Sequence, residues 1–222
     1  LVDLAAAKKV LEPDVENCVG FFAAFSADGK RLLTDGPGSR GHRSDRALLW
    51  DLESGSLLRR FELDGSLRCG VLTPDGEIAV TGDNRGNVIF WETLAGKRLG
   101  EVRVEAPAVL DLAIDRAGAT VAAVSSYPVP YVSIIDVGRR VELNRIPQEE
   151  VIRAVALSGD GKLLALAGKN SGLVIHDVAT GNRVQEFAGH VGGCSSLAFN
   201  ADASALVSGG FRGGAALWRV NH

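Results

Sequence analysis

The chain has 222 residues, a formal net charge of −3 and 46% hydrophobic residues. This balance is typical of a globular protein, and it excludes a disordered chain and a broadly basic nucleic-acid-binding surface. No apolar run approaches the ~20 residues that a transmembrane helix needs, and the N-terminus lacks a secretory signal pattern. Three widely spaced cysteines predict reduced thiols. We therefore expect a cytoplasmic protein that binds neither nucleic acid nor a membrane.

The first predicted elements are short strands. LVDL (1–4) and AAAKKVLEP (5–13) predict two of them, and FFAAFSADGKRLLTDG (21–36) predicts a strand, a polar turn and a second strand. The loop GPGSRGHRSDR (36–46) carries the G-x-G-x-x-G spacing of a dinucleotide-binding turn. That turn needs a following helix whose N-terminus faces the phosphates, whereas RALLWDL (46–52) predicts a strand. We therefore interpret Gly36–Arg46 as an exposed loop without a nucleotide.

The strand–turn–strand pattern recurs along the rest of the chain. The further copies are RCGVLTPDGEIAVTGD (68–83), LDLAIDRAGATVAAVS (110–125), RAVALSGDGKLLALAG (153–168) and SSLAFNADASALVSGG (195–210). Measured at the turn, successive copies are 47, 42, 43 and 42 residues apart, at Asp28, Asp75, Ala117, Asp160 and Asp202. The loop at 36–46 accounts for the larger first spacing.

A second anchor follows each copy. It reads ALLWDL, VIFWET, VSIIDV, LVIHDV and AALWRV, and in four copies a small turn and a fourth strand come next. Four short strands in about 42 residues is the length of a β-propeller blade. We therefore predict an all-β fold, a β-propeller of about five four-stranded antiparallel blades, in a single domain over 1–222. The expected blades are 15–64, 65–105, 106–147, 148–189, and 190–222 completed by 1–14.

At these anchors the chain resembles the WD-repeat family. Trp50 and Asp51 form the WD dipeptide, Gly189 and His190 form the GH dipeptide, and SADG, TPDG and SGDG are the family's first turn. The resemblance covers nearly the whole chain. It implies structural roles for Trp50, Asp51, Trp91, His190, Ser208 and Trp218. It also implies a hydrogen bond from His190 toward Ser208 and Trp218.

The chain departs from the family at the turn between the second and third strands. The family usually has an aspartate there, whereas this chain has Arg85, Ser171 and Arg212 in three of its copies. This departure makes the family's hydrogen-bond network incomplete.

The two termini suggest how the ring closes. LVDL is interpreted as the end of a third strand and AAAKKVLEP as a fourth strand that belongs to an earlier blade. The last copy stops after its third strand, so the fourth strand near the start would complete it. We expect Val10 and Leu11 to pair alongside the strand that contains Leu217 and Trp218. The alternative is that these blades are part of a larger propeller, which in this family usually has seven blades.

No catalytic motif stands out. The four histidines lack metal-ligand spacing, and neither a P-loop nor a nucleophile elbow is present. His176 occupies the position of the core tryptophan, so we interpret it as a packed substitute. Asp28, Asp75 and Asp160 are interpreted as turn-forming residues. We therefore expect no enzyme activity, no cofactor and no bound metal.

The resemblance implies that partners bind the narrow face, where the second-to-third turns and the fourth-to-first loops emerge. Arginine beside aromatic residues is typical of binding hot spots, although exposed arginines can also be merely solvated. The predicted partner-binding residues are Phe21, Arg68, Arg153, Asn84, Arg85, Phe211 and Arg212.

We therefore predict a non-catalytic scaffold for protein–protein interaction, with an acidic protein or peptide partner and an oligomeric state left open. The alternative is a ligand-sensing or regulatory propeller module of a larger bacterial signalling enzyme, a kinase or an NTPase. Catalysis in the central channel is a third hypothesis.

Overall fold

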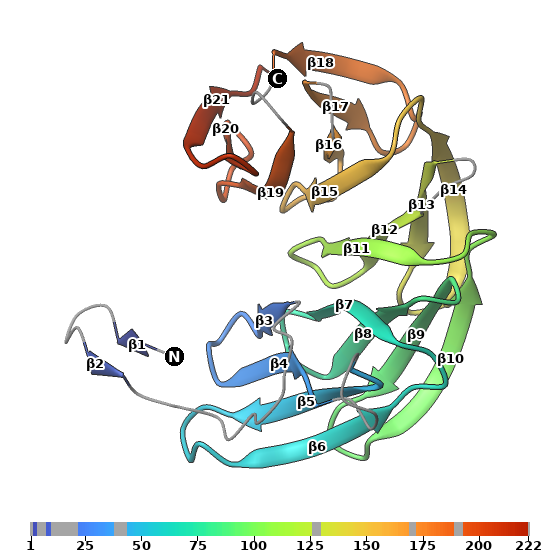
Figure 1. Cartoon of the computed structure of the whole chain (residues 1–222), viewed down its shortest axis with the longest axis vertical. Coiled ribbons are helices and arrows are strands. Elements are labelled where there is room, and N and C mark those ends of the chain that lie inside the picture. The colour runs from blue at the N-terminus through green and yellow to red at the C-terminus, as the bar shows by residue number, and fades with distance from the viewer. Residues whose placement is uncertain are drawn as a thin grey trace.

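Five antiparallel sheets follow one another along the chain in the computed structural model (Figure 1). The structure describes residues 2–3, 8–9, 22–37, 44–125, 130–168, 172–188 and 193–221, and within these ranges every regular element is a strand. The all-β fold class is therefore confirmed. Blade 1 comprises β3 (Ala23–Phe25), β4 (Arg31–Asp35), β5 (Arg46–Asp51) and β6 (Leu57–Glu62). Blade 2 comprises β7 (Leu67–Leu72), β8 (Ile78–Asp83), β9 (Asn87–Glu92) and β10 (Lys97–Arg103).

The other blades continue the pattern. Blade 3 comprises β11 (Val109–Ile114), β12 (Thr120–Ser125), β13 (Tyr131–Asp136) and β14 (Val141–Pro147). Blade 4 comprises β15 (Ile152–Leu157), β16 (Leu163–Gly168), β17 (Leu173–Asp177) and β18 (Arg183–Phe187). Blade 5 comprises β19 (Cys194–Phe199), β20 (Ala205–Gly210) and β21 (Ala215–Arg219). The first strand of each blade contacts the first strand of the next. Figure 1 shows these first strands facing the centre of an arc, with the fourth strands on its outside.

Neighbouring blades are held together by apolar side chains that alternate along the strands. Leu33 and Leu49 of blade 1, for example, share one buried cluster with Ile89 and Trp91 of blade 2. Because successive side chains of a strand point to opposite faces, each central strand packs against the blade on either side. This double burial explains why the second and third strands read as continuous apolar runs.

One cross-strand pair repeats in every blade, on the face that blades 1 to 4 turn toward the next blade. It joins the second and third strands at Leu33–Leu49, Val80–Phe90, Ala122–Ile134, Ala165–Ile175 and Val207–Leu217. In blades 1 to 4 the pair is at most 1% exposed. In blade 5, Val207 is 45% exposed and Leu217 is 75% exposed, because no described blade covers that face.

Every first turn is closed by a side-chain oxygen at the end of the first strand. In blade 2 the Thr73 hydroxyl accepts the backbone N–H of Ile78 at 2.9 Å and donates to Asp75 at 2.6 Å. Those bonds, with the N–H of Glu77, hold the pKa of Asp75 below its usual value. Asp28 and Asp160 are bonded in the same way, which confirms the prediction that these aspartates form turns.

The N-terminal strands pair with each other. β1 (Val2–Asp3) is antiparallel to β2 (Lys8–Lys9), with Val2 opposite Lys9. The third and fourth strands of the complete blades use the same seven-residue offset, as at Trp50 and Leu57. The register of β1 and β2 therefore matches that of a third-to-fourth hairpin. Among the described strands β21 has no fourth-strand partner, and the expected pairing of Val10 and Leu11 lies outside the described residues.

The loop at 36–46 joins two antiparallel strands. Its base is closed by the N–H of Gly36, which donates to the carbonyl of Arg46 at 3.0 Å and to the buried Ser44 hydroxyl at 3.2 Å. β5 follows the loop, so no helix N-terminus faces its glycines. Residues 38–43 lie outside the described residues.

Candidate interaction surface

A β-bulge marks the start of the first strand in blades 2 to 5. The pairing register shifts around one residue in each of these strands: Arg68, Leu110, Arg153 and Ser195. A bulge residue is left unpaired, and its side chain is re-aimed relative to the ladder. These residues lie at the same ends of the sheets as the second-to-third turns, because the first strands are antiparallel to the second. The sheet register therefore brings the predicted positions to the narrow face.

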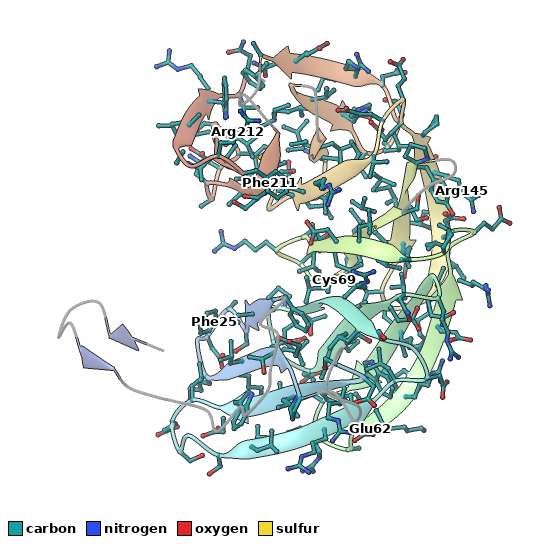
Figure 2. The ribbon with its side chains drawn as sticks, in the orientation of Figure 1. Phe25, Glu62, Cys69, Arg145, Phe211 and Arg212 are labelled. Carbon is teal, nitrogen blue, oxygen red and sulfur yellow. The ribbon has the colours of Figure 1, made fainter. Side chains whose placement is uncertain are left out.

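Blades 4 and 5 bring two of the predicted residues together. The Arg153 guanidinium of β15 lies 6.0 Å from the ring centroid of Phe211, in the turn between β20 and β21. Phe211 is 54% exposed, and Arg153 and Arg212 are exposed as well. Figure 2 shows Phe211 and Arg212 at the blade 5 end of the arc.

Blade 2 holds the other predicted residues. Arg68 is half-buried, and its Nε is buried without a hydrogen-bond partner among the described residues. Asn84 accepts the backbone N–H of Ser66 at 2.7 Å, so it fixes its turn. Arg85 is exposed and lines a hollow of about 450 Å³ together with Arg103 and Glu105. The structure thus places two arginine groups on this face, one on blade 2 and one on blades 4 and 5.

The tryptophan anchors hold the second and third strands together. The indole N–H donates to a hydroxyl of the second strand, from Trp50 to Thr34 at 3.1 Å, from Trp91 to Thr81 at 2.9 Å and from Trp218 to Ser208 at 2.7 Å. The expected partner His190 and the predicted site residue Phe21 lie outside the described residues.

The comparisons with known proteins agree with this repeat. A family model described as "WD domain, G-beta repeat" matches residues 181–219, which hold the third anchor tryptophan. WD repeat-containing protein SL1-17 of Schistosoma mansoni is 28% identical over 62% of this chain and 45% of its own length. WD repeat-containing protein 55 of Mus musculus is 31% identical over 68% of this chain and 37% of its own length.

The chain belongs to the WD-repeat family. A shorter match is the U3 snoRNP-associated protein-like EMB2271 of Arabidopsis thaliana, 38% identical over 31% of this chain and 14% of its own length. The chain thus spans less than half the length of these three relatives.

The WD-repeat aspartate Asp51 caps the turn between the third and fourth strands. Its carboxylate accepts the backbone N–H of Ser54 at 2.7 Å and the Ser54 hydroxyl at 2.6 Å, which lowers the pKa of Asp51. Asp177 binds Thr180 in the same way. This role is local and structural.

His176 replaces the WD-repeat tryptophan in blade 4. It is 5% exposed, and its Nδ1 lies 3.0 Å from the carbonyl oxygen of Gly181. The second-strand residue that would accept from an indole here is Leu166, which has no acceptor, so the ring bonds to the turn instead. The prediction of a packed substitute agrees with this burial.

We expect Thr81→Val to destabilise this WD-repeat chain by about 1–2 kcal/mol. The substitution keeps the shape of a fully buried side chain but leaves the Trp91 indole N–H without its acceptor. Urea denaturation of both proteins measures the change. In a Trp91→Phe background the same substitution should cost much less, and an equal cost there would contradict the role of the hydrogen bond.

Asp111 is a partly buried titratable residue that sequence reasoning missed. It follows the bulge of β11 and accepts the backbone N–H of Val155 at 3.1 Å, which joins blade 3 to blade 4. Burial raises the pKa of Asp111 to about 6 despite this bond and one from the N–H of Leu112. Burial and the Asp111 charge also raise the pKa of the nearby Cys69 thiol. No sequence motif marks Asp111, because its burial comes from packing between blades.

The opposite end of the sheets has an apolar hollow of about 430 Å³. The first turns of all five blades line it, with Phe25, Leu72 and Phe199 among its apolar residues and Arg116 as its one cation among the lining residues. Within the described ranges no group of histidine, cysteine or acidic side chains is arranged to hold a metal ion. In the same ranges no helical segment has the length and hydropathy that membrane crossing requires.

Proposed function

We propose that this chain is a non-catalytic interaction scaffold that binds an acidic segment of a partner protein on its narrow face. The observation that carries the proposal is the contact between Arg153 and Phe211 across blades 4 and 5. A guanidinium beside an aromatic ring keeps its N–H groups available for a carboxylate, while the ring supplies an apolar anchor. Arg212 adds a second cation next to that anchor.

The charge distribution supports an anionic ligand. The chain carries a net charge of −3, yet the narrow face carries Arg68, Arg85, Arg153 and Arg212. Cations on one face raise the association rate of anionic partners in a salt-sensitive way.

The name of one relative supports a partner within a larger assembly. The name of the Arabidopsis protein connects that protein with the U3 snoRNP. For this chain we propose a protein surface within a larger assembly as the ligand, rather than nucleic acid, because the overall charge is negative. A cytoplasmic location remains part of the proposal. The alternative, a sensing module of a bacterial kinase or NTPase, has no support from the relatives' names.

Selection of a displayed random peptide library against the chain tests the proposal. We expect the selected peptides to be rich in aspartate and glutamate, with affinity that falls as salt rises. The double reversal Arg85→Glu with Arg212→Glu should weaken binding at least ~tenfold. It should leave the Tm nearly unchanged, because exposed charges contribute little to stability.

The matched control reverses two exposed arginines away from the narrow face, Arg60→Glu with Arg139→Glu, and makes the same change in net charge. Peptides without acidic enrichment, or equal loss of binding in both double variants, would contradict the proposal.

A further inference from the structure

A hollow of about 450 Å³ on blade 2 is lined by two arginines that have no acidic partner among the described residues. Arg85 lies in the turn between β8 and β9, and Arg103 ends β10. Both residues are exposed. The described ion pairs of this region involve other arginines, Arg98 and Arg145. Two cations without a counter-charge favour an anionic ligand.

The hollow is shaped by a loop that packs directly on Gly86. The N–H of Val104 donates to the Gly86 carbonyl at 2.8 Å, and the N–H of Ala106 donates to the Val104 carbonyl at 2.8 Å. Gly86 has a φ of 80°, and a Cβ there would overlap the carbonyl oxygen of Ala106. Only glycine allows this approach. The turn that carries Arg85 and the loop that follows Arg103 are therefore held together.

The carboxylates closest in sequence to the two arginines are bound elsewhere. Asp83 is fully buried, and its Oδ1 accepts the backbone N–H groups of Arg85 and Asn87 at 2.8 Å each. Its Oδ2 accepts the side-chain amide of Asn87 at 2.8 Å. Glu105 lines the hollow, but its Oε2 lies 3.0 Å from Nη1 of Arg145. The two guanidinium groups of the hollow therefore stay available to a ligand.

Blade 1 shows how the same place can be neutralised within a blade. Arg103 is opposite Asn87 in the pairing of β9 with β10, and the equivalent pair in blade 1 is Arg46 with Glu62. There the Nε of Arg46 lies 3.7 Å from a carboxylate oxygen of Glu62. Blade 2 instead has an amide opposite its cation, and that amide donates to Asp83. Blade 2 therefore carries an unneutralised cation where blade 1 has an ion pair.

We propose that this hollow binds the phosphoryl group of a phosphorylated serine or threonine in a segment of a partner protein. Such a group carries a charge of about −1.5 to −2 and three acceptor oxygens, so it can pair with both guanidinium groups at once. A carboxylate carries a single charge and would leave one arginine unneutralised. The inference rests on the proposed function in that its ligand is a protein segment on the narrow face, but its site is distinct from the contact between Arg153 and Phe211.

The surroundings of the hollow disfavour a polyanion such as RNA or an anionic membrane. Glu105 lines the hollow itself. Glu101 lies on the same side of β10 as Arg103, because side chains two residues apart in a strand share one face. A row of phosphates would bring further negative charges against these carboxylates. A single phosphoryl group avoids that repulsion.

Retention of the chain on immobilised peptide libraries tests the proposal. The libraries are random on both sides of a fixed central residue, which is phosphoserine, serine or aspartate. We expect at least ~tenfold greater retention on the phosphoserine library than on the aspartate library. Arg103→Gln should abolish this preference. Arg60→Gln is the matched control and should keep it, because Arg60 is an exposed arginine of β6, another fourth strand.

The Nε–H resonances of the arginines report the contact directly. Titration of the chain with N-acetyl-phosphoserine amide should shift the signals of Arg85 and Arg103 saturably and leave that of Arg60 in place. Equal retention on the phosphoserine and aspartate libraries, or a preference that survives Arg103→Gln, overturns the proposal. Stronger Arg103-dependent binding to single-stranded RNA or to phosphoinositide vesicles than to the phosphoserine library overturns it as well.

The outcome separates this inference from the proposed function. Acidic peptides that bind through Arg212 but gain nothing from phosphorylation would overturn the inference and leave the proposed function intact. Phosphoserine-dependent retention through Arg103, without enrichment of acidic residues in unmodified peptides, would support the inference and contradict the acidic ligand.

Discussion

Leu49→Ala should lower the free energy of unfolding by about 3 kcal/mol, whereas Leu217→Ala should change it by less than about 0.5 kcal/mol. The two leucines occupy the same position in blades 1 and 5, each opposite the paired residue of the second strand. Leu49 is fully buried against blade 2, and Leu217 is 75% exposed. The pair therefore isolates the effect of a neighbouring blade on one substitution at one position.

Urea denaturation of the two variants and the parent chain provides the measurement, with the slope of the transition checked for constancy. Equal destabilisation by the two substitutions would mean that the face of blade 5 is covered in solution. A negligible effect of Leu49→Ala would contradict the packing of blade 1 on blade 2.

Asp111→Asn should stabilise the chain by about 2–3 kcal/mol above pH 7 and have almost no effect below pH 4. Burial raises the pKa of Asp111 from its usual 3.8 to about 6. The folded chain therefore holds a proton there that the unfolded chain releases, and stability falls as the pH rises through this window. Asparagine carries no charge, and its side-chain oxygen can still accept the N–H groups of Val155 and Leu112.

Unfolding free energies of Asp111→Asn and the parent chain across this pH range test the expectation. The turn aspartates, whose pKa values are lowered, lose their contribution at lower pH in both proteins, so they cancel in the difference. Asp111→Glu is a useful control, because it keeps the charge and should show no such gain. A difference that does not vary with pH would contradict the buried carboxyl.

The repeat made the fold predictable from the sequence. Each blade has its own local signals, namely a turn such as that of Asp75 and an anchor such as Trp91. The same short-range pattern therefore predicts the same blade structure five times along the chain. The loop at 36–46 was separable for the same reason, because it interrupts a regular spacing.

The candidate site was less accessible to this reasoning. Register placed Arg153 and Phe211 on one face, but their contact depends on how blades 4 and 5 sit side by side, which no local pattern encodes. The burial of Asp111 is likewise a property of packing between blades. The closure expected for Val10 and Leu11 rests on counting strands, and it stays a prediction because both residues lie outside the described part of the chain.

The bulge at the start of the first strand has a consequence for how such a chain can diversify. Because the bulge residue contributes little to the hydrogen-bond ladder of the sheet, its substitution changes the side chain that the narrow face presents to a ligand. The blade beneath is preserved. Arg68, Leu110, Arg153 and Ser195 already sample a cation, an aliphatic group and a hydroxyl at equivalent places. These bulge positions on the narrow face can therefore change independently of one another, and new binding specificities can arise through single substitutions.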